Sequence, residues 1–355
     1  MSQRNNIHVV GTGTIGEPLI GILCVLRQQL GLDQITFHKA TPRMTDRAKV
    51  QVLVQKGAIL AATPETTDAF RKMGLEPQMT HTEAIAQAKV IIDCTPVGND
   101  NKTQIYSQFD DGSRVFIAQG SELGFGKPYA RGINDSVLLR GEDRFIQVVS
   151  CNTHNIAVLI KTIAGVNGGP GMLDSARFVC MRRASDISQS GSFVPGPEVG
   201  KHDDENFGTH HARDAVFLFR TLGHELDLFS SAMKLNTQYM HAIHFAIKVN
   251  RPLNVDEVIR RLRDERRVSV TDKKSAAQVF SFGRDHGIYG RILNQTVVSL
   301  PTLAVRKGNE VFGFCFTPQD GNSLLSSISV AMWHLHKAGW DDRMRYLREY
   351  CFSEI

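Results

Sequence analysis

Apolar residues follow two different rhythms along this chain of 355 residues. In the first 150 residues, short apolar runs alternate with segments that repeat apolar positions at the 3.6-residue period of a helix. We expect strands at residues 7–10, 35–37, 58–62, 90–94, 115–118 and 145–149, and helices at 15–30, 48–55 and 65–73. This alternation predicts an α/β domain over residues 1–150, built on a parallel sheet.

The part of the chain after about residue 165 combines alternating strand patterns with fewer helices. Strands are expected at 177–182, 225–235, 239–249, 295–306 and 310–317, and helices at 212–222, 254–263 and 322–336. We therefore assign residues 151–319 to an α+β domain for catalysis, substrate binding and oligomerisation, with a mixed or antiparallel sheet. We expect the segment 320–355 to pack back on the first domain. Residues 188–208, rich in Gly, Pro and acidic side chains, predict a long surface loop.

A glycine-rich sequence, Gly-Thr-Gly-Thr-Ile-Gly, occupies positions 11–16, directly after the first expected strand and at the start of the first expected helix. In this G-x-G-x-x-G pattern, the glycines allow a tight turn and a close backbone approach to a pyrophosphate at the helix N-terminus. Gly11, Gly13 and Gly16 therefore predict a Rossmann dinucleotide-binding domain. The alternative is a plain glycine turn.

The second expected strand is followed by the sequence His-Lys-Ala-Thr-Pro-Arg at positions 38–43. It lacks the acidic residue that binds the ribose 2′-hydroxyl in many NAD enzymes. Lys39 and Arg43 instead supply two cations that could pair with a 2′-phosphate, which favours NADP and leaves use of NAD open. The alternative is that both residues are solvated loop charges.

Cys151 lies where the expected strand 145–149 ends and an apolar, helix-like stretch begins. A cysteine in the first turn of a helix lies near free backbone N–H groups and the positive end of the dipole, which favour the thiolate. In this setting it is a candidate nucleophile for a carbonyl. The alternative is a buried structural cysteine, and the polar neighbours Ser150, Asn152 and Thr153 argue against it.

A nucleophilic cysteine needs a histidine nearby to move a proton, and the chain has 13 histidines. His210 and His211 precede a helix-like segment and could meet an anion at its N-terminus. His241 and His244 lie on the expected strand 239–249 and point to opposite faces of it, so only one can face the site easily. The spacing alone does not select His241.

Composition narrows the classes of function further. Hydrophobic residues make up 42% and charged residues 22% of the chain, as in ordinary soluble proteins, and the formal net charge is +5. The sequence has no block of Lys and Arg that would predict nucleic-acid binding. It also has no apolar stretch close to the roughly 18 residues that a membrane span needs. The six cysteines form no C-x-x-C pair, which argues against a metal site, and without a secretory signal they indicate reduced thiols in the cytoplasm.

Seven motifs, taken in order, resemble one known family. They are residues 11–16, Lys39 to Arg43, Gln119-Gly120, Val148 to Thr153, Arg182-Arg183, His210-His211 and Gln319-Asp320. Over nearly the whole chain, this order is similar to that of the archaeal-type (type II) phosphorylating glyceraldehyde-3-phosphate dehydrogenases. The most specific motif is Val-Val-Ser-Cys-Asn-Thr, because the Rossmann glycines are shared far more widely.

The resemblance implies a reaction in which the Cys151 thiolate attacks the aldehyde of glyceraldehyde 3-phosphate. Hydride transfer to NADP or NAD then leaves a thioester, which inorganic phosphate cleaves to 1,3-bisphosphoglycerate. It also implies a cytoplasmic homotetramer that acts in glycolysis or gluconeogenesis.

The resemblance further implies roles for individual residues. The implied cofactor contacts are Thr14, Ile15, Gln119, Gly120, Arg182 and Gln319, beside the glycines, Lys39 and Arg43. The implied substrate and phosphate contacts are Ser150, Asn152, Thr153, His210 and His211. His241 aligns with the residue proposed as general base in the family, and this raises it above His244.

Two departures from the family pattern concern the substrate more than the type of reaction. The family usually continues Cys-Asn-Thr with Thr-Gly, whereas this chain has His154 and Asn155. About four additional residues precede His241. The alternatives left open are another cysteine-dependent enzyme, such as an aspartate-semialdehyde dehydrogenase or acyl-phosphate reductase, and a non-catalytic dinucleotide-binding regulator.

Overall fold

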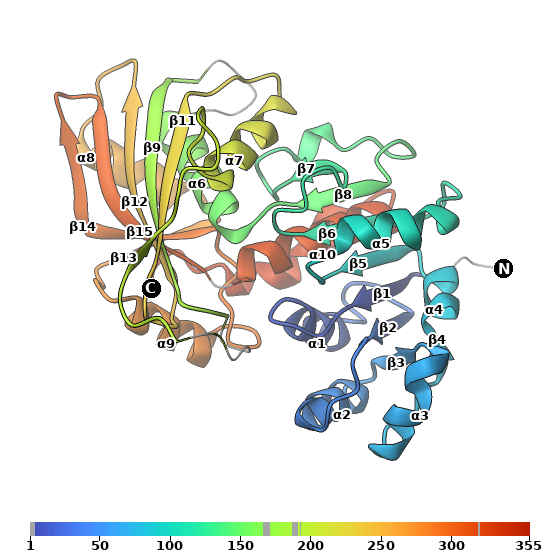
Figure 1. Ribbon diagram of the computed structural model, residues 1–355. Helices are drawn as coiled ribbons and strands as arrows, with labels where there is room; N and C mark the ends of the chain where they lie inside the picture. Colours follow the sequence, from blue (N-terminus) through green and yellow to red (C-terminus); the bar gives the residue numbers. More distant parts are fainter. Residues whose placement is uncertain (1–3, 166–170, 187–190, 192, 319) are drawn as a thin grey trace. The chain divides into compact units, whose positions relative to one another are not determined.

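The computed structural model describes residues 4–165, 171–186, 191, 193–318 and 320–355 (Figure 1). The chain divides into two compact units. Unit 1 comprises Met1–Lys127, Leu139–Val148 and Ser326–Tyr346, and unit 2 comprises Pro128–Leu138, Val149–Leu325 and Leu347–Ile355. The chain therefore passes between the units several times, and its C-terminal segment is shared by both.

Unit 1 contains an eight-stranded sheet in the order β4-β3-β2-β1-β5-β6-β8-β7. Its strands are β1 (Asn6–Val10), β2 (Gln34–His38), β3 (Ile59–Ala62), β4 (Met79–Thr80), β5 (Val90–Asp93), β6 (Val115–Gln119), β7 (Lys127–Tyr129) and β8 (Phe145–Val148). The pairs from β4 through β8 are parallel. From β1 the chain adds β2, β3 and β4 on one side and β5, β6 and β8 on the other, so the strand order reverses between β1 and β5. In such sheets, ligands bind at the carboxyl ends of the strands where the order reverses, here between β1 and β5.

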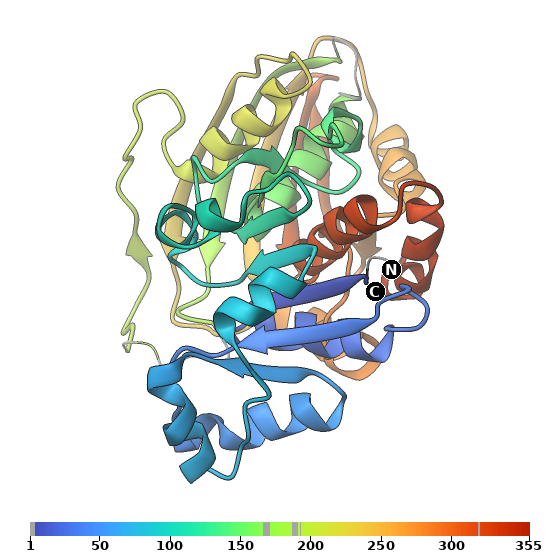
Figure 2. The same cartoon turned by 90° about the vertical axis from the view of Figure 1, so that its right-hand side faces the viewer.

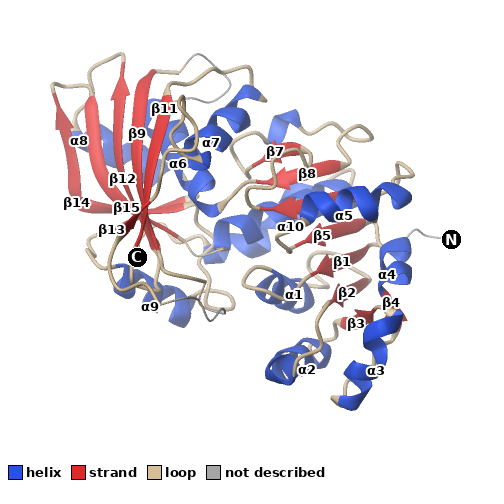
Figure 3. Cartoon of the chain, in the orientation of Figure 1, coloured by secondary structure: helices blue, strands red, loops and turns tan. Residues whose placement is uncertain are grey.

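Helices surround this sheet, as Figure 3 shows. They are α1 (Gly16–Val25), α2 (Arg47–Gln55), α3 (Pro64–Lys72), α4 (His81–Gln87) and α5 (Gly98–Gln104), with short turns at Met44–Asp46, Tyr106–Phe109 and Asp135–Val137. Every residue of β1, β5 and β6 is buried, because a parallel sheet is covered on both faces. This burial explains why the apolar runs predicted these strands well.

Unit 2 is built on a seven-stranded mixed sheet in the order β10-β11-β9-β12-β15-β14-β13. The strands are β9 (Leu173–Arg182), β10 (Glu198–Val199), β11 (Leu228–Lys234), β12 (His241–Val249), β13 (Val268–Thr271), β14 (Thr296–Arg306) and β15 (Glu310–Thr317). The helices are α6 (Cys151–Ala164), α7 (His210–Arg220), α8 (Val255–Asp264) and α9 (Ala276–His286). Figure 2 shows the segment around β10 along the edge of this sheet.

One face of the unit 2 sheet packs on α6, α7 and α8 to form a continuous apolar core. The pattern of β12 shows how: its odd-numbered residues from His241 to Val249 are buried, and the residues between them are more exposed. The predicted fold class is confirmed, with a parallel α/β sheet and a second, mixed sheet.

One sequence prediction of a helix differs from the structure. The helix expected at 15–30 ends at Val25, because Leu26 leaves helical geometry and Gly31 closes the following turns with φ +66°. Leu30 is buried and fits the apolar period of the helix, so the sequence pattern extended the expected helix beyond its end. The helix expected at 322–336 is α10 (Gly321–Leu335), and its polar residues Asn322 and Ser323 are buried. It is followed by α11 (Trp340–Arg343) and the turns of Met344–Tyr350.

Candidate active site

The glycine loop of unit 1 has the geometry of a dinucleotide-binding turn. Gly11 has φ +93°, and its N–H donates to the carbonyl oxygen of His38 at 2.9 Å. A Cβ atom on Gly16 would collide with the carbonyl oxygen of Gly11, whereas one on Gly13 would meet nothing within 4 Å. Gly11 and Gly16 therefore close the turn, and Gly13 leaves an open backbone surface beside the start of α1.

The remaining predicted cofactor contacts of unit 1 lie at two places. Thr14 is buried in the glycine loop, and Ile15 is the residue before α1. Gln119 ends β6, and its amide Nε2 donates to Ser327 Oγ at 2.6 Å, so this nitrogen is engaged within the unit. Gly120 follows with φ +80°, a conformation that favours glycine.

The charged residues after β2 form a small network. Lys39 Nζ lies 2.6 Å from Asp46, and Lys49 Nζ lies 3.4 Å from the same carboxylate. Lys49 also donates to the carbonyl oxygen of Thr12 in the glycine loop at 3.2 Å. The hydrogen bond from Lys39 holds the pKa of Asp46 below its ordinary value. Two lysines thus share one carboxylate near the loop, and the Arg43 side chain is exposed.

In unit 2, Cys151 is the first residue of α6, as the sequence predicted. Ser150 is the N-cap, and its Oγ accepts from the N–H of Thr153 at 3.3 Å. Thr153 is fully buried, with its hydroxyl 2.9 Å from that of Ser150. Asn322 Nδ2 donates to the carbonyl oxygen of Cys151 at 3.0 Å. Ser150 and Thr153 thus stabilise the helix start, and Asn322 holds the peptide of the nucleophile.

The Cys151 thiol differs from the expectation of a lowered pKa. Burial, followed by the charge of Asp320, raises the pKa of Cys151 to about 11, and Arg183 acts in the opposite direction. Asp320 lies 3.9 Å from both Arg183 and Arg291, and its backbone has φ +60°. Desolvation and a nearby carboxylate therefore outweigh the helix N-terminus at Cys151.

His241 faces the same side of the sheet as α6. Its Nδ1 lies 3.2 Å from Asn152 Nδ2, and burial together with Arg183 and Arg182 lowers the pKa of His241 to about 3. His244 points to the other face, where its ring contacts Phe314 with 5.0 Å between centroids. The prediction that His241 and His244 point to opposite faces of the strand is confirmed.

His210 and His211 begin α7, and their rings lie 4.0 Å apart between centroids. Burial is the main cause that lowers the pKa of both rings, most strongly for His211, and the positive charge of nearby Arg182 adds to the shift. Neither ring nitrogen of His211 has a hydrogen-bond partner among the described residues. A buried imidazole without partners beside a helix N-terminus suits an anionic ligand.

No protein-family model matches this chain. It is 24% identical over 353 residues to the glyceraldehyde-3-phosphate dehydrogenase of Sulfolobus acidocaldarius, covering 97% of this chain and 96% of the relative. The enzyme of the same name from Methanobrevibacter smithii is 26% identical, with 92% of each chain covered, and that from Metallosphaera sedula is 27% identical, with 86% and 85% covered.

The chain is thus similar over most of its length to proteins named glyceraldehyde-3-phosphate dehydrogenase from several archaea. The resemblance seen in the motifs is therefore confirmed at 23–27% identity over most of the chain.

The departure from the archaeal glyceraldehyde-3-phosphate dehydrogenase pattern at His154 has a structural explanation. His154 is fully buried, and its Nδ1 donates to the carbonyl oxygen of Ser150 at 3.0 Å. Burial lowers the pKa of His154 to about 4, so the ring is neutral near pH 7. The His154 side chain therefore bonds within the first turn of α6, to the backbone of the N-cap residue Ser150.

Sequence reasoning assigned no role to three residues near the nucleophile: Arg183, Asp320 and Asn322. Arg183 forms an ion pair with Asp186, and its side chain is 5% exposed. Motifs around Arg183 and Asp320 were recognised, but which side chain turns inward was not readable from them. Arg182, the predicted cofactor contact, is exposed, and Gln319 lies outside the described residues.

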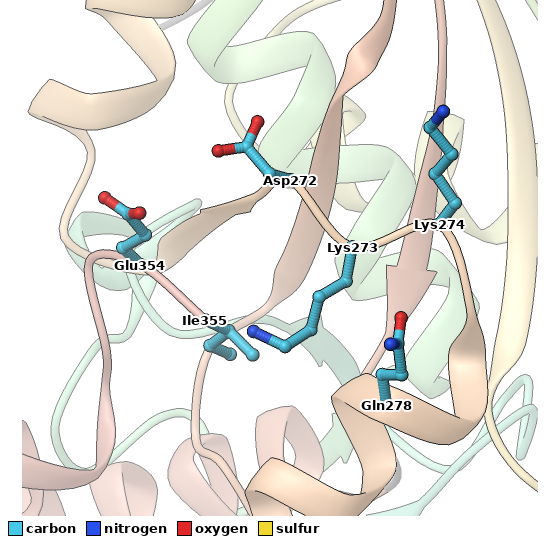
Figure 4. A pocket seen from close by; sticks show the side chains of 6 residues that line it. All are labelled: Asp272, Lys273, Lys274, Gln278, Glu354 and Ile355. Carbon is cyan, nitrogen blue, oxygen red and sulfur yellow. The ribbon is translucent and has the colours of Figure 1, made fainter.

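Two further observations concern other kinds of function. Among the described residues, no group of three or more His, Cys, Asp or Glu could hold a metal ion, and no helix has the length and apolarity to cross a membrane. A cavity of about 460 Å³ in unit 2 is lined by Asp272, Lys273, Lys274, Gln278, Glu354 and Ile355. In Figure 4, Lys273 extends toward Ile355. None of the predicted site residues lines this cavity.

Proposed function

We propose that this protein catalyses the NAD(P)-dependent, phosphorylating oxidation of glyceraldehyde 3-phosphate, or of a closely related phosphorylated aldehyde, to an acyl phosphate. The observation that carries the proposal is Cys151 on the first turn of α6, next to Asn152, which contacts His241. A relative named glyceraldehyde-3-phosphate dehydrogenase matches 97% of the chain at 24% identity and supports the proposal.

The dinucleotide fits the residues of unit 1. The open backbone at Gly13 and the N-terminus of α1 suit a pyrophosphate, and Lys39, Arg43 and Lys49 suit the additional phosphate of NADP. When bound, NADP or NAD supplies the hydride acceptor. We favour NADP, because the cation Lys39, and no acidic residue, follows β2 directly.

The substrate reaction is assigned to unit 2. The sulfur of Cys151 bonds to the aldehyde carbon, and the thiol proton ends on the carbonyl oxygen, giving a hemithioacetal. Loss of hydride from that carbon and of the hydroxyl proton leaves a thioester. Phosphate oxygen then attacks the thioester carbon, the C–S bond breaks, and the acyl phosphate leaves with regeneration of the sulfur nucleophile.

Two groups in unit 2 support recognition of phosphate. His210 and His211 begin α7. Arg182 is exposed, and its positive charge lies close enough to lower the pKa of both rings. An anion bound there would favour protonation of these rings, which burial disfavours in the free protein. We assign this place to a phosphate group of the substrate or to inorganic phosphate, and Asn152 to orienting the substrate.

An activity panel tests the proposal. Purified protein is mixed with glyceraldehyde 3-phosphate and NADP or NAD, with and without inorganic phosphate, and reduced cofactor is followed at 340 nm. We expect phosphate-dependent turnover with wild type and none with Cys151→Ser, while Cys24→Ser retains activity. Cys151→Ser should still bind NADP in calorimetry, because the glycine loop is unchanged. Turnover of aspartate semialdehyde alone would replace this proposal with the semialdehyde dehydrogenase alternative, and lack of any turnover would favour the regulator.

The remaining expectations concern the state of the protein in the cell. A homotetramer in the cytoplasm is what the family resemblance implies. Light scattering of the purified protein would test the tetramer directly, since four chains of 39.4 kDa differ clearly from a dimer or monomer.

A further inference from the structure

A buried chain of hydrogen bonds ends at His241. Cys315 Sγ donates to Asn155 Oδ1 at 3.3 Å, and Asn155 Nδ2 donates to Thr317 Oγ1 at 2.8 Å. Thr317 Oγ1 donates to Asn152 Oδ1 at 3.1 Å, and Asn152 Nδ2 lies 3.2 Å from His241 Nδ1. Five side chains thus form one continuous path within unit 2.

Three elements bring these side chains together. Asn152 and Asn155 are three residues apart on α6 and therefore share a helix face. Cys315 and Thr317 are two residues apart on β15 and share a sheet face, and Thr317 pairs directly with His241 of β12. All five residues are at most 9% exposed, so water has little access to compete for these bonds.

The direction of each bond follows from counting donors and acceptors. An amide oxygen only accepts, so the oxygen of Asn155 can accept the single thiol hydrogen of Cys315, for which the carbonyl oxygen of Ile243 at 3.7 Å is a more distant acceptor. The nitrogen of Asn155 donates to Thr317. The Thr317 hydroxyl passes its own hydrogen to the oxygen of Asn152. The nitrogen of Asn152 then faces Nδ1 of His241 as a donor, so Nδ1 is the acceptor.

We propose that Asn155 and Thr317 are positioning residues that act through Asn152 to hold neutral His241 in the tautomer with its proton on Nε2. This inference rests on the proposed function and deepens it. His241 then donates through Nε2 to the aldehyde oxygen as negative charge develops there, and keeps its own proton while the Cys151 thiol proton ends on that oxygen. The residue proposed as a base thus acts first as a hydrogen-bond donor.

The proposal also gives a role to Asn155, where the chain departs from the family pattern. Glycine, the residue usual at that position, has no side chain to link Cys315 with Thr317. The amide of Asn155 supplies this link inside the first turns of α6. The low pKa of His241 supports a neutral ring across the working pH range.

The first test reads the tautomer without substrate. Protein labelled with ¹⁵N in its histidines is examined at pH 7.5, and the His241 signals are assigned by their loss in His241→Asn. We expect the shifts of an unprotonated Nδ1 and a protonated Nε2 in wild type, and a mixture of tautomers in Thr317→Val. A wild-type ring protonated on Nδ1, or a spectrum that Thr317→Val leaves unchanged, would overturn the proposal.

The second test separates positioning from general stability. Thr317→Val should lower kcat/KM about tenfold, roughly the effect of one lost buried hydrogen bond, whereas Thr317→Ser keeps the hydroxyl and should restore most activity. Thr302→Val is the matched control, because it removes a β14 hydroxyl that bonds only to the hairpin backbone. Equal activity of the Val and Ser variants would contradict the proposal.

A third variant covers the case in which Thr317→Val does not fold. Asn155→Ala breaks the same chain one link earlier and is expected to give the same mixed tautomer spectrum; an unmixed spectrum would count against the proposal. If wild type does not oxidise glyceraldehyde 3-phosphate, the proposed function fails, while the spectra still decide the tautomer. If wild type is active but its His241 carries the proton on Nδ1, only the present inference fails.

Discussion

The side-chain amide of Asn322, at the start of α10, donates to the backbone carbonyl of Cys151 at 3.0 Å. The same Nδ2 lies 3.4 Å from the carbonyl oxygen of Gln295, and Asn322 is fully buried. One buried amide thus ties the nucleophile's peptide to a second segment of unit 2. A residue without any recognisable catalytic chemistry therefore helps to define where the thiol lies.

Replacing Asn322 by Ala should leave two buried carbonyls with fewer donors. We expect unfolding to become easier by about 1–3 kcal/mol, as for other buried groups that lose a partner. Thermal unfolding followed by circular dichroism measures this loss. Gln55→Ala, at an exposed position at the end of α2, is the control and should change stability by less than about 0.5 kcal/mol. A variant as stable as wild type would show that Asn322 is not needed to hold Cys151.

The alkylation of Cys151 should depend steeply on pH in the free protein. Its pKa is raised to about 11 by burial and then by Asp320, so the thiolate fraction rises about tenfold per pH unit between pH 7 and 10. Asp320→Asn removes a negative charge, lowers the pKa of Cys151 and should speed iodoacetamide labelling at pH 8.

Mass spectrometry of the peptide that contains Cys151 gives the labelling rate. Asp203→Asn, at an exposed ion pair with Lys201, serves as the control. A rate that reaches a plateau near pH 8 in wild type would mean that the helix N-terminus dominates over burial after all.

The preference for NADP should respond to the network around Asp46. Asp46→Asn removes the carboxylate that pairs with Lys39 and Lys49, so both cations become available to the 2′-phosphate. We expect the Kd for NADP to fall about three- to fivefold and the Kd for NAD to stay unchanged. Lys39→Glu should shift preference the other way, toward NAD. An unchanged ratio of the two Kd values in both variants would exclude Lys39 as a phosphate contact.

A cluster of histidines in unit 1 predicts acid sensitivity. His8 Nε2 lies 3.1 Å from His81 Nδ1, and the rings of His38 and His81 stack at 3.9 Å between centroids. Burial lowers the pKa of His38 to about 3 and that of His81 to about 4, while nearby Asp93 raises the latter. Between about pH 6.5 and pH 4, these rings are therefore protonated in the unfolded chain but neutral in the folded protein.

Because the unfolded state takes up these protons, stability should fall as pH drops through that window, by about 1.4 kcal/mol per pH unit for each ring. Hydrogen exchange of the β1 and β2 amides at pH 7 and pH 5 measures the change. His38→Phe keeps the stacking and should flatten the dependence, whereas the exposed His286→Asn should not. Equal slopes for wild type and His38→Phe would contradict this account.

The sequence alone predicted most of the elements that carry the site. Buried strands such as β1 and β5 read as apolar runs, and the alternation along β12 showed that His241 and His244 face opposite sides. The end of β8 and the start of α6 were readable from the change between a β-branched run and the Ser150 cap. These features depend on local periodicity and capping, which neighbouring residues determine.

Tertiary structure decided the properties that depend on distant residues. Local sequence indicated a lowered pKa for Cys151, but burial and Asp320, far along the chain, raise it. Lys39 was predicted as a cation that could pair with a 2′-phosphate, and its pairing with Asp46 required the turn before α2. The path from Cys315 through Asn155 and Thr317 to His241 joins α6, β12 and β15, so no periodicity in the sequence could show it. The residues and their local elements follow from short-range preferences, whereas charge, protonation and hydrogen bonding at the site follow from which remote side chains share the same buried space.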